Sequence, residues 1–466
     1  MSPGHTSPFR AELSATLRLA APLALANILQ MAVFAIDVIF VARLGQEALA
    51  AASLSVAMFG LMIWCFSGLT GAVAPLIAAE LGRGRHALRE VRRSVRMALW
   101  LAVLCGLSGM AVCNFGEEIM LAAGQQPRVA EQAGGFLFIL QFALIPMIGS
   151  NVLRIFVSAL GRPVFATAIT ALAIFVNALG NYALVFGNLG APRLGLEGSA
   201  LASVLTALAT FAAYCVAIRT DRRLHRYRIF GRWWRPEWTR LRELVHIGTP
   251  IALTVGAEGG LFGSAAFLMG LLGEAELAGH TVALQIAAFA FQVPFGIAQA
   301  ATIRVGFHYG AANAAGMARA GKAALLAGMG FMVLPAAAML LAPRFILSAY
   351  VDVNDPANAA MIGFAVQFLA IGAAFQLFDG TQTVAAGVLR GLQDTRVPMI
   401  IALSGYWLGG FVTAAALGFL TPLRGVGIWI GLAVGLVIVA GLLLRRWHRR
   451  DELGLIPVYA ARAATG

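Results

Sequence analysis

The chain has 466 residues, of which 60% are hydrophobic and 12% are charged, and its mean hydropathy is +0.82. A soluble protein of this length carries far more charge, so the composition argues against an ordinary soluble enzyme and indicates a polytopic membrane protein. The net charge of +13 does not indicate a nucleic-acid partner, because the arginines gather at the ends of apolar stretches, as they do in cytoplasmic loops.

Twelve apolar stretches are each long enough for a transmembrane helix, which needs about 20 residues. The pattern predicts helices at 15–43, 53–80, 91–113, 130–159, 164–187, 195–218, 245–272, 281–309, 321–342, 359–389, 397–420 and 425–445. The first stretch is too long for a signal peptide and lacks a small-residue cleavage site, so we expect a retained helix. The four cysteines lie inside these stretches and are interpreted as packing residues: Cys65, Cys105, Cys113 and Cys215.

The loops between the predicted helices alternate in charge. Basic loops follow the second, sixth and twelfth helices, with the sequences GRGRHALREVRRSVR, RTDRRLHRYRIFGRWWRPEWTRLRELVH and RRWHRR. The alternate loops carry acidic residues, namely Glu47, Glu117, Glu118, Glu131, Glu274, Glu276, Asp352 and Asp355. Because basic loops stay in the cytoplasm, we expect a multi-pass protein of the bacterial inner (plasma) membrane with both termini cytoplasmic.

The sequence also repeats itself at a shift of 228 residues. LAAPLALANILQ at 19–30 then meets IGTPIALTVGAE at 247–258, with Pro22 on Pro250. Such repeats are common in transporters, whose sites lie at mid-membrane or between the halves. We therefore predict two six-helix halves in parallel orientation: an N-terminal lobe at 1–218, a cytoplasmic basic linker at 219–244, a C-terminal lobe at 245–445 and a cytoplasmic tail at 446–466.

The linker contains Trp233, Trp234 and Trp238 among its arginines. This composition is typical of a stretch that lies on the inner membrane face. A solvated helix would have the same composition, and the sequence leaves both interpretations open.

Three acidic residues lie well inside predicted membrane helices: Asp37 in the first, Glu258 in the seventh and Asp379 in the tenth. If charged and facing lipid, the three together would cost about 8–10 kcal/mol. We therefore expect them to face a wet cavity or to be neutral, since burial favours the protonated acid. The structural alternative is a carboxylate hydrogen-bonded to a Ser or Asn on a neighbouring helix.

Asn177 and Asn181 lie four residues apart in the fifth predicted helix, on one helical face. Two amide oxygens near the Asp37 carboxylate would form an oxygen-rich site for Na⁺ or a proton relay. The alternative is a role in helix–helix association. Pro22 and Pro250 each remove a backbone hydrogen bond, and we predict a hinge at both.

Patterns of enzymes are missing from the sequence. It contains no HExxH, CxxC or Walker A pattern and no nucleophile elbow. We expect neither catalysis nor a cofactor. The pore-lining ring that would indicate a channel is also not visible.

The residues quoted above resemble those of the multidrug and toxic compound extrusion (MATE) family, in particular its NorM-like branch. The similarity extends over nearly the whole chain and is most specific at Pro22 with VFAIDVIFVARLG, at GTPIALTVGAEGG and at FDGTQTVAAGVLRGLQDTRVP. Relatives often carry a Tyr where this chain has Phe375 and a Gln where it has Thr281.

The resemblance implies a V-shaped antiporter that exports cationic lipophilic compounds in exchange for Na⁺ or H⁺. It implies that Asp37, Asn177 and Asn181 couple to the cation. It assigns Glu258 and Asp379 to cation or substrate binding in the second lobe. We add Gln30, which the repeat aligns with Glu258.

An alternative function is a lipid-linked oligosaccharide or metabolite flippase of a related fold, which would favour a cationic cavity and additional helices. The expected partners are membrane lipids and small cationic organic substrates. The sequence leaves the coupling ion, the natural substrates and the oligomeric state open, and a monomer is compatible with it.

Overall fold

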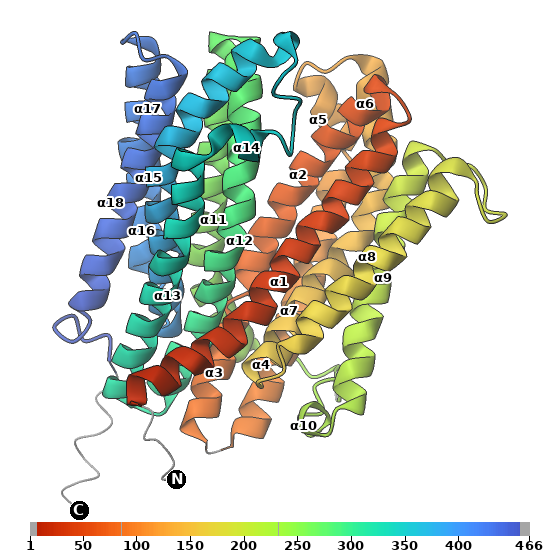
Figure 1. Cartoon of the computed structure of the whole chain (residues 1–466). Coiled ribbons are helices and arrows are strands. Elements are labelled where there is room, and N and C mark those ends of the chain that lie inside the picture. Colours follow the sequence, from red (N-terminus) through yellow and green to blue (C-terminus); the bar gives the residue numbers. More distant parts are fainter. Residues whose placement is uncertain (1–6, 85, 232, 457–466) are drawn as a thin grey trace, which may run out of the picture. The chain divides into compact units, whose positions relative to one another are not determined.

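The computed structural model describes residues 7–84, 86–231 and 233–456, and within these ranges the chain is helical and has no β-strand (Figure 1). Twelve helical stretches of the described residues are long and apolar enough to cross a membrane, which confirms the all-α fold with twelve transmembrane helices. Shorter helices connect them: α5 (Gly116–Ala122), α10 (Arg222–His225) and α14 (Pro343–Leu347).

The first six spans are formed by α1 (Pro8–Ala42), α2 (Gln46–Thr70) with α3 (Val73–Arg83), α4 (Ala87–Cys113), α6 (Pro127–Leu140) with η1 (Gln141–Ala143) and α7 (Leu144–Ala159), α8 (Val164–Phe186) and α9 (Leu196–Thr220). The other six are formed by α11 (Trp238–Leu272), α12 (Glu274–Gly310), α13 (Ala314–Leu341), η2 (Pro356–Asn358) with α15 (Ala359–Gly391), α16 (Arg396–Leu403) with η3 (Ser404–Phe411) and α17 (Val412–Phe419), and α18 (Gly425–His448).

Some of these spans are less regular than the sequence suggested. The predicted helix 130–159 contains the 3₁₀ turn η1, and the predicted helix 397–420 contains the π-helical segment η3. A π-helix adds one residue per hydrogen-bonded turn and is frequent at functional sites. Hydropathy reports only that a stretch is apolar, so it cannot reveal this change of hydrogen-bond pattern.

The chain forms two compact units. Unit 1 comprises Met1–Ala24, Leu81–Gly84 and Leu253–Gly466, and unit 2 comprises Leu25–Glu80 and Arg85–Ala252, as far as these residues are described. Three helices of the described residues therefore contribute to both units: α1 divides after Ala24, α3 divides after Glu80 and α11 divides after Ala252. In the two long helices α1 and α11 the division falls two residues after a proline, Pro22 in α1 and Pro250 in α11.

Unit 2 is held together by an apolar core between α2, α6, η1, α7 and α9. Phe59, Phe136, Leu137 and Leu144 lie in this core, and each is at most 4% exposed. Where the alternative is exposure to water, burying one large apolar side chain stabilises the folded protein by about 1.5–3 kcal/mol. In lipid the same packing acts through close van der Waals contact instead.

Unit 1 is built around α12, α15 and α18. A Cβ on Gly387 of α15 would lie 2.6 Å from the carbonyl oxygen of Ala298 in α12, so only glycine permits this approach of the two backbones. The Thr302 hydroxyl of α12 then donates to the Gly387 carbonyl at 2.8 Å. Between α15 and α18, the rings of Phe368 and Trp429 stack with centroids 6.0 Å apart. Close backbone packing and aromatic stacking thus hold α15, the helix that carries Asp379, against α12 and α18.

Candidate functional site

Asp37 is the centre of a polar cluster in unit 2, which we call the Asp37 site. Asn177 and Asn181 of α8 donate from Nδ2 to its Oδ1 at 2.9 and 2.8 Å. Ser203 of α9 donates from its hydroxyl to Oδ2 at 3.0 Å. The structure therefore brings together the three residues predicted from sequence and adds Ser203 as a fourth.

The helices position these side chains by their spacing. Asn177 and Asn181 are one turn apart on α8, and both are fully buried. Between them, Gly180 lets α8 approach α9, because a Cβ there would lie 3.1 Å from Cβ of Ala202. This close approach brings Ser203, the neighbour of Ala202, to the carboxylate. No pattern in the sequence indicated Ser203, since small polar residues are common wherever membrane helices meet.

The Asp37 site is arranged to hold an anion. All three partners of the carboxylate are donors, and hydrogen bonds to a charged acceptor are stronger than neutral ones. One acceptor in the site lacks a donor, because Asn181 Oδ1 is buried and has no hydrogen-bond partner among the residues that the structure describes. A buried acceptor left unpaired costs about 1–3 kcal/mol. A proton on Asp37 or a bound cation would remove that cost, so the residues present fit either ion.

Asp37 itself is half-buried and keeps exposed surface, whereas its two amide partners do not. The sequence allowed the alternative that Asp37 is simply hydrogen-bonded to Ser or Asn side chains of neighbouring helices, and such hydrogen bonds are present. They leave the carboxylate partly accessible.

The two other intramembrane acids share a second cluster in unit 1, the Glu258 site. Gln382 of α15 donates from Nε2 to Oε1 of Glu258 and to Oδ1 of Asp379, each at 3.2 Å. Glu258 belongs to α11 and Asp379 to α15. One amide group therefore bridges two carboxylates, which places two like charges close together and favours a proton or a positively charged ligand between them.

The orientation of this amide is fixed from the opposite side. The Tyr406 hydroxyl, buried in the π-helical segment η3, donates to Oε1 of Gln382 at 2.8 Å. Because Oε1 faces Tyr406, Nε2 must face the carboxylates. Arg390 of α15 adds an electrostatic interaction with Glu258.

Sequence reasoning did not identify Gln382, Tyr406 or Arg390 as site residues. Gln382 stands three residues after Asp379 inside a quoted motif, so helical spacing could have indicated it. Nothing in the sequence distinguished Tyr406.

The remaining predicted residues lie in α1 and α11. Gln30 is half-buried in the part of α1 that belongs to unit 2, and its grouping with Glu258 and Asp379 stays a prediction. Pro22 lies in the unit 1 part of α1 and Pro250 in the unit 2 part of α11. Their role as hinges also stays a prediction. Phe375, where relatives often carry Tyr, is buried and packs edge-on against Phe262 and Trp429.

The MatE family model matches this chain at residues 22–183 and 250–415. The two matched segments begin at the positions of Pro22 and Pro250, which are related by the 228-residue shift of the repeat.

Proteins of similar sequence cover almost the same length. The probable multidrug resistance protein NorM of Mesorhizobium japonicum is 46% identical over 445 residues, which are 96% of this chain and 95% of that protein. The multidrug resistance protein NorM of Burkholderia vietnamiensis is 38% identical over 438 residues, 94% of each chain. The crystal structure of the eukaryotic MATE transporter AtDTX14 is 20% identical with a TM-score of 0.84, covering 97% of this chain and 100% of that one.

Proposed function

Since the chain belongs to the MatE family, we propose that it is a secondary active antiporter that exports cationic lipophilic compounds in exchange for Na⁺ or H⁺. The names of the NorM relatives support multidrug efflux as the activity. The observation that carries the proposal is the Asp37 site, a carboxylate inside a membrane-spanning helix held by three donors beside an unpaired acceptor. The twelve apolar helices support a multi-pass protein, and its relatives are bacterial.

The mechanism rests on competition for Asp37. The ionised carboxylate attracts a cationic substrate. When Asp37 takes up H⁺ or Na⁺, its net charge disappears and the substrate loses that attraction. The amide of Asn181 can then rotate, so that its free oxygen accepts the new proton or coordinates the cation. The state with a free carboxylate thus leaves the Asn181 oxygen unpaired, and the ion-bound state gives it a partner.

Exchange follows from this competition because two ligands that share one site can only occupy it alternately. The ion drives substrate release by its differential affinity for the two conformations of the protein. Bending of α1 at Pro22 and of α11 at Pro250 would connect these conformations, since each helix has its two ends in different units.

The Glu258 site is proposed as the second cation or substrate site. Two carboxylates on one amide attract a positive group more strongly than one does. Gln30, the counterpart of Glu258 in the repeat, is also proposed to bind cation or substrate. The acidic character of both sites favours a cationic substrate over the anionic headgroup that a flippase would carry.

The orientation is proposed from the basic loops. Both termini would lie in the cytoplasm of a bacterial inner membrane. A fluorescent protein fused at the C-terminus should fluoresce in cells, and an alkaline phosphatase fusion at the same position should be inactive. The opposite pair of results would reject this orientation.

Replacement of Asp37 by Asn tests the coupling. The variant keeps the shape of the side chain but cannot bind a proton or supply a negative charge. Purified protein is reconstituted in liposomes, and efflux of a cationic dye is followed while a Na⁺ gradient and a pH gradient are imposed separately. We expect ion-driven efflux to fall at least about tenfold, the effect of losing about 1.4 kcal/mol of ion binding.

The matched control is Glu118→Gln, which neutralises an exposed acid in α5 outside the predicted spans. It should retain ion-driven efflux. Unchanged coupled efflux in Asp37→Asn would reject the proposed role of Asp37, and the gradient that drives wild-type efflux identifies the coupling ion.

A further inference from the structure

Residues 219–245, as far as they are described, comprise the end of α9, the stretch that follows it and the first two turns of α11, and we call them the linker segment. This segment has a defined conformation against α4. The indole Nε1 of Trp100 donates to the carbonyl oxygen of Trp233 at 3.0 Å, and the two rings stack with centroids 6.2 Å apart. Arg92 donates from Nε to the carbonyl oxygen of Tyr227 at 2.7 Å. The segment is therefore not a free loop, and its outward-facing side chains form a surface that can be described.

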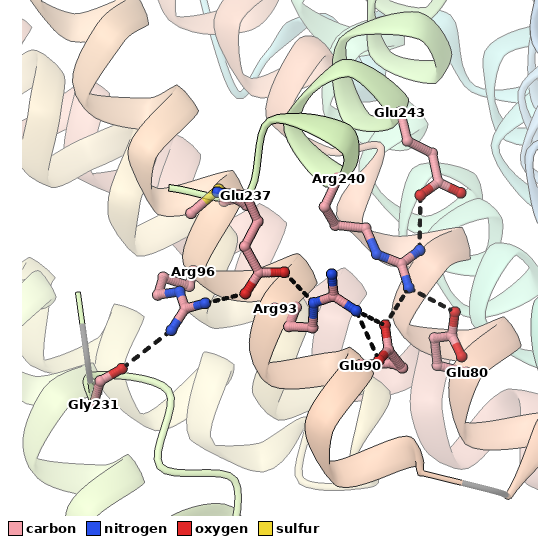
Figure 2. A network of polar contacts seen from close by, with 9 residues as sticks. Glu80, Glu90, Arg93, Arg96, Gly231, Glu237, Arg240 and Glu243 are labelled. Atoms are coloured by element: carbon pink, nitrogen blue, oxygen red, sulfur yellow. Dashed lines mark hydrogen bonds and ion pairs between the residues drawn. The ribbon is translucent and has the colours of Figure 1, made fainter. Parts of the chain in front are cut away.

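An ion-pair network fixes the end of this segment and the first turn of α11 (Figure 2). Glu237 accepts hydrogen bonds from Arg93 and Arg96 of α4. Arg240 donates to Glu90 of α4 at 2.7 Å and also bonds Glu80 of α3. These contacts all lie within unit 2.

Each acidic residue of the segment forms an ion pair with an arginine. Glu237 is engaged by Arg93 and Arg96, and Glu243 lies 2.7 Å from Arg240. Asp221 pairs with Arg162 at 3.1 Å and also caps the backbone of α10. Each of these acids therefore has a basic partner, and only Glu243 keeps a substantial exposed fraction, 39% of its side chain.

The arginines of the segment differ in this respect. Seven of them are exposed and have no ion pair within the described part of the chain: Arg219, Arg222, Arg223, Arg226, Arg228, Arg235 and Arg242. Because the acids are paired, the exposed charge of the segment is predominantly positive.

Two tryptophans accompany these arginines at the surface. Trp234 is 74% exposed and Trp238 is 67% exposed, whereas Trp233 packs on Trp100. Trp238 and Arg242 are one turn apart on α11, and the exposed Val245 continues the same face. The opposite face, with Leu244 and Ile247, is buried. An exposed tryptophan at the end of a membrane-spanning helix is typical of the interface between headgroups and acyl chains.

We propose that this linker surface, formed by the seven arginines with Trp234 and Trp238, binds anionic phospholipid headgroups. The charge is complementary, and each arginine near an anionic membrane contributes about fivefold to association. The tryptophans insert at headgroup depth, and the exposed Val245 on the same face of α11 as Trp238 follows them toward the acyl chains. A nucleic acid or an acidic protein would bind the arginines but would leave the exposed tryptophans and Val245 in water. The inference is independent of the proposed antiport.

Lipid binding by the purified full chain tests the proposal. Native mass spectrometry in neutral detergent measures the apparent Kd for phosphatidylglycerol and for phosphatidylcholine. The variant Arg235→Gln/Arg242→Gln removes the two charges nearest to the exposed tryptophans. We expect its affinity for phosphatidylglycerol to fall at least about tenfold, as two such arginines predict, with little change for phosphatidylcholine.

The matched control is Arg128→Gln/Arg193→Gln, which removes two exposed arginines elsewhere in unit 2. Its phosphatidylglycerol affinity should change less than twofold. An equal loss in both variants would mean that net charge alone governs binding, and no loss in either would mean that this surface is not the lipid site. Each result would overturn the proposal.

The tryptophans provide a second test. Protein in bilayers that contain brominated phosphatidylglycerol should show quenched tryptophan fluorescence, and the double variant Trp234→Phe/Trp238→Phe should lose a measurable part of that quenching. Bromines next to the headgroup should quench this part more than bromines deep in the chains. Equal quenching of the wild type and the double variant would show that the two side chains do not contact lipid, against the proposal.

Discussion

At the scale of single residues, one hydroxyl decides which group faces the two acids of the Glu258 site. The amide of Gln382 has a donor end and an acceptor end, and the Tyr406 hydroxyl holds the acceptor end at 2.8 Å. Without this contact the amide could rotate by half a turn and present its oxygen to Glu258 and Asp379. Oxygen facing two carboxylates would repel them, so Tyr406 acts on the site through Gln382.

The variant Tyr406→Phe tests this arrangement. It removes the hydroxyl and keeps the ring, so we expect a loss of about 1 kcal/mol in unfolding free energy from one hydrogen bond. The KM for a cationic substrate should rise several-fold while the maximal rate changes less, because the carboxylates are no longer oriented. Dye efflux at varied substrate concentration measures both.

The control for this substitution is Tyr182→Phe, which removes an exposed hydroxyl in unit 2 and should leave both parameters unchanged. If Tyr406→Phe lowered stability but left KM as in the wild type, the hydroxyl would have a structural role only.

Some residues of the two sites could be predicted from the sequence, and others could not. Asp37, Glu258 and Asp379 were found from sequence because a carboxylate is conspicuous in an apolar stretch. Asn177 and Asn181 followed from helical spacing. Ser203 and Tyr406 could not be found, since their roles depend on which helices are neighbours and, for Tyr406, on the π-helical turn that carries it.

At the scale of elements, the twelve spans followed from hydropathy, but the segments between them did not. The sequence left open whether the basic linker is a helix in solvent or lies on the membrane. The two ends of the predicted linker 219–244 belong to the long helices α9 and α11, since α11 begins at Trp238 and not at 245. The rest contains the short helix α10 and folds against α4 through backbone contacts and the Glu237 network. Such contacts between residues about 140 positions apart have no periodic pattern by which a sequence could reveal them.

Glu237 should be the key residue of this element. The variant Glu237→Gln removes the carboxylate that Arg93 and Arg96 share. Arg93 keeps its ion pair with Glu90, whereas Arg96 has a side chain only 7% exposed. We expect about 2 kcal/mol of destabilisation, discounted from the cost of breaking a fully buried pair because Glu237 keeps 20% of its surface. Trypsin should also cleave the linker several times faster.

Limited proteolysis and thermal unfolding measure the two effects. Glu243→Gln is the internal control, because its pair with Arg240 is local and its side chain is 39% exposed. It should have a much smaller effect. Equal sensitivity of the two variants to trypsin would contradict the assigned role of Glu237.

At the scale of the whole molecule, the repeat preserves an ion pair with reversed polarity. In unit 1, Glu12 of α1 accepts two 2.8 Å hydrogen bonds from Arg304 of α12 and lies 3.3 Å from His308. In unit 2, Arg240 of α11 donates to Glu80 of α3 at 3.1 Å. The 228-residue shift relates Glu12 to Arg240 and Glu80 to His308. Each pair thus fixes the start of the first helix of one half.

A charge swap tests the unit 1 pair. Glu12→Arg or Arg304→Glu alone places like charges together, and each should lower the unfolding free energy by about 2 kcal/mol, a value reduced because Arg304 is 27% exposed. The double variant Glu12→Arg/Arg304→Glu should recover more than half of the loss in thermal unfolding. The exposed pair Arg449–Glu452, swapped in the same way, should show little effect. A double variant no more stable than the sum of its single changes would show that the two residues are not coupled.

The sharing of α1 and α11 between the two units has a consequence for biosynthesis. Unit 2 is complete only after the ribosome has translated Ala252, which lies well inside the second repeat. Unit 1, in turn, includes the start of α1, which is among the first residues to be translated. Neither repeat is therefore a self-sufficient folding module. Separately expressed halves would each lack a helix start that the other supplies, and would mature only by complementation in the same membrane.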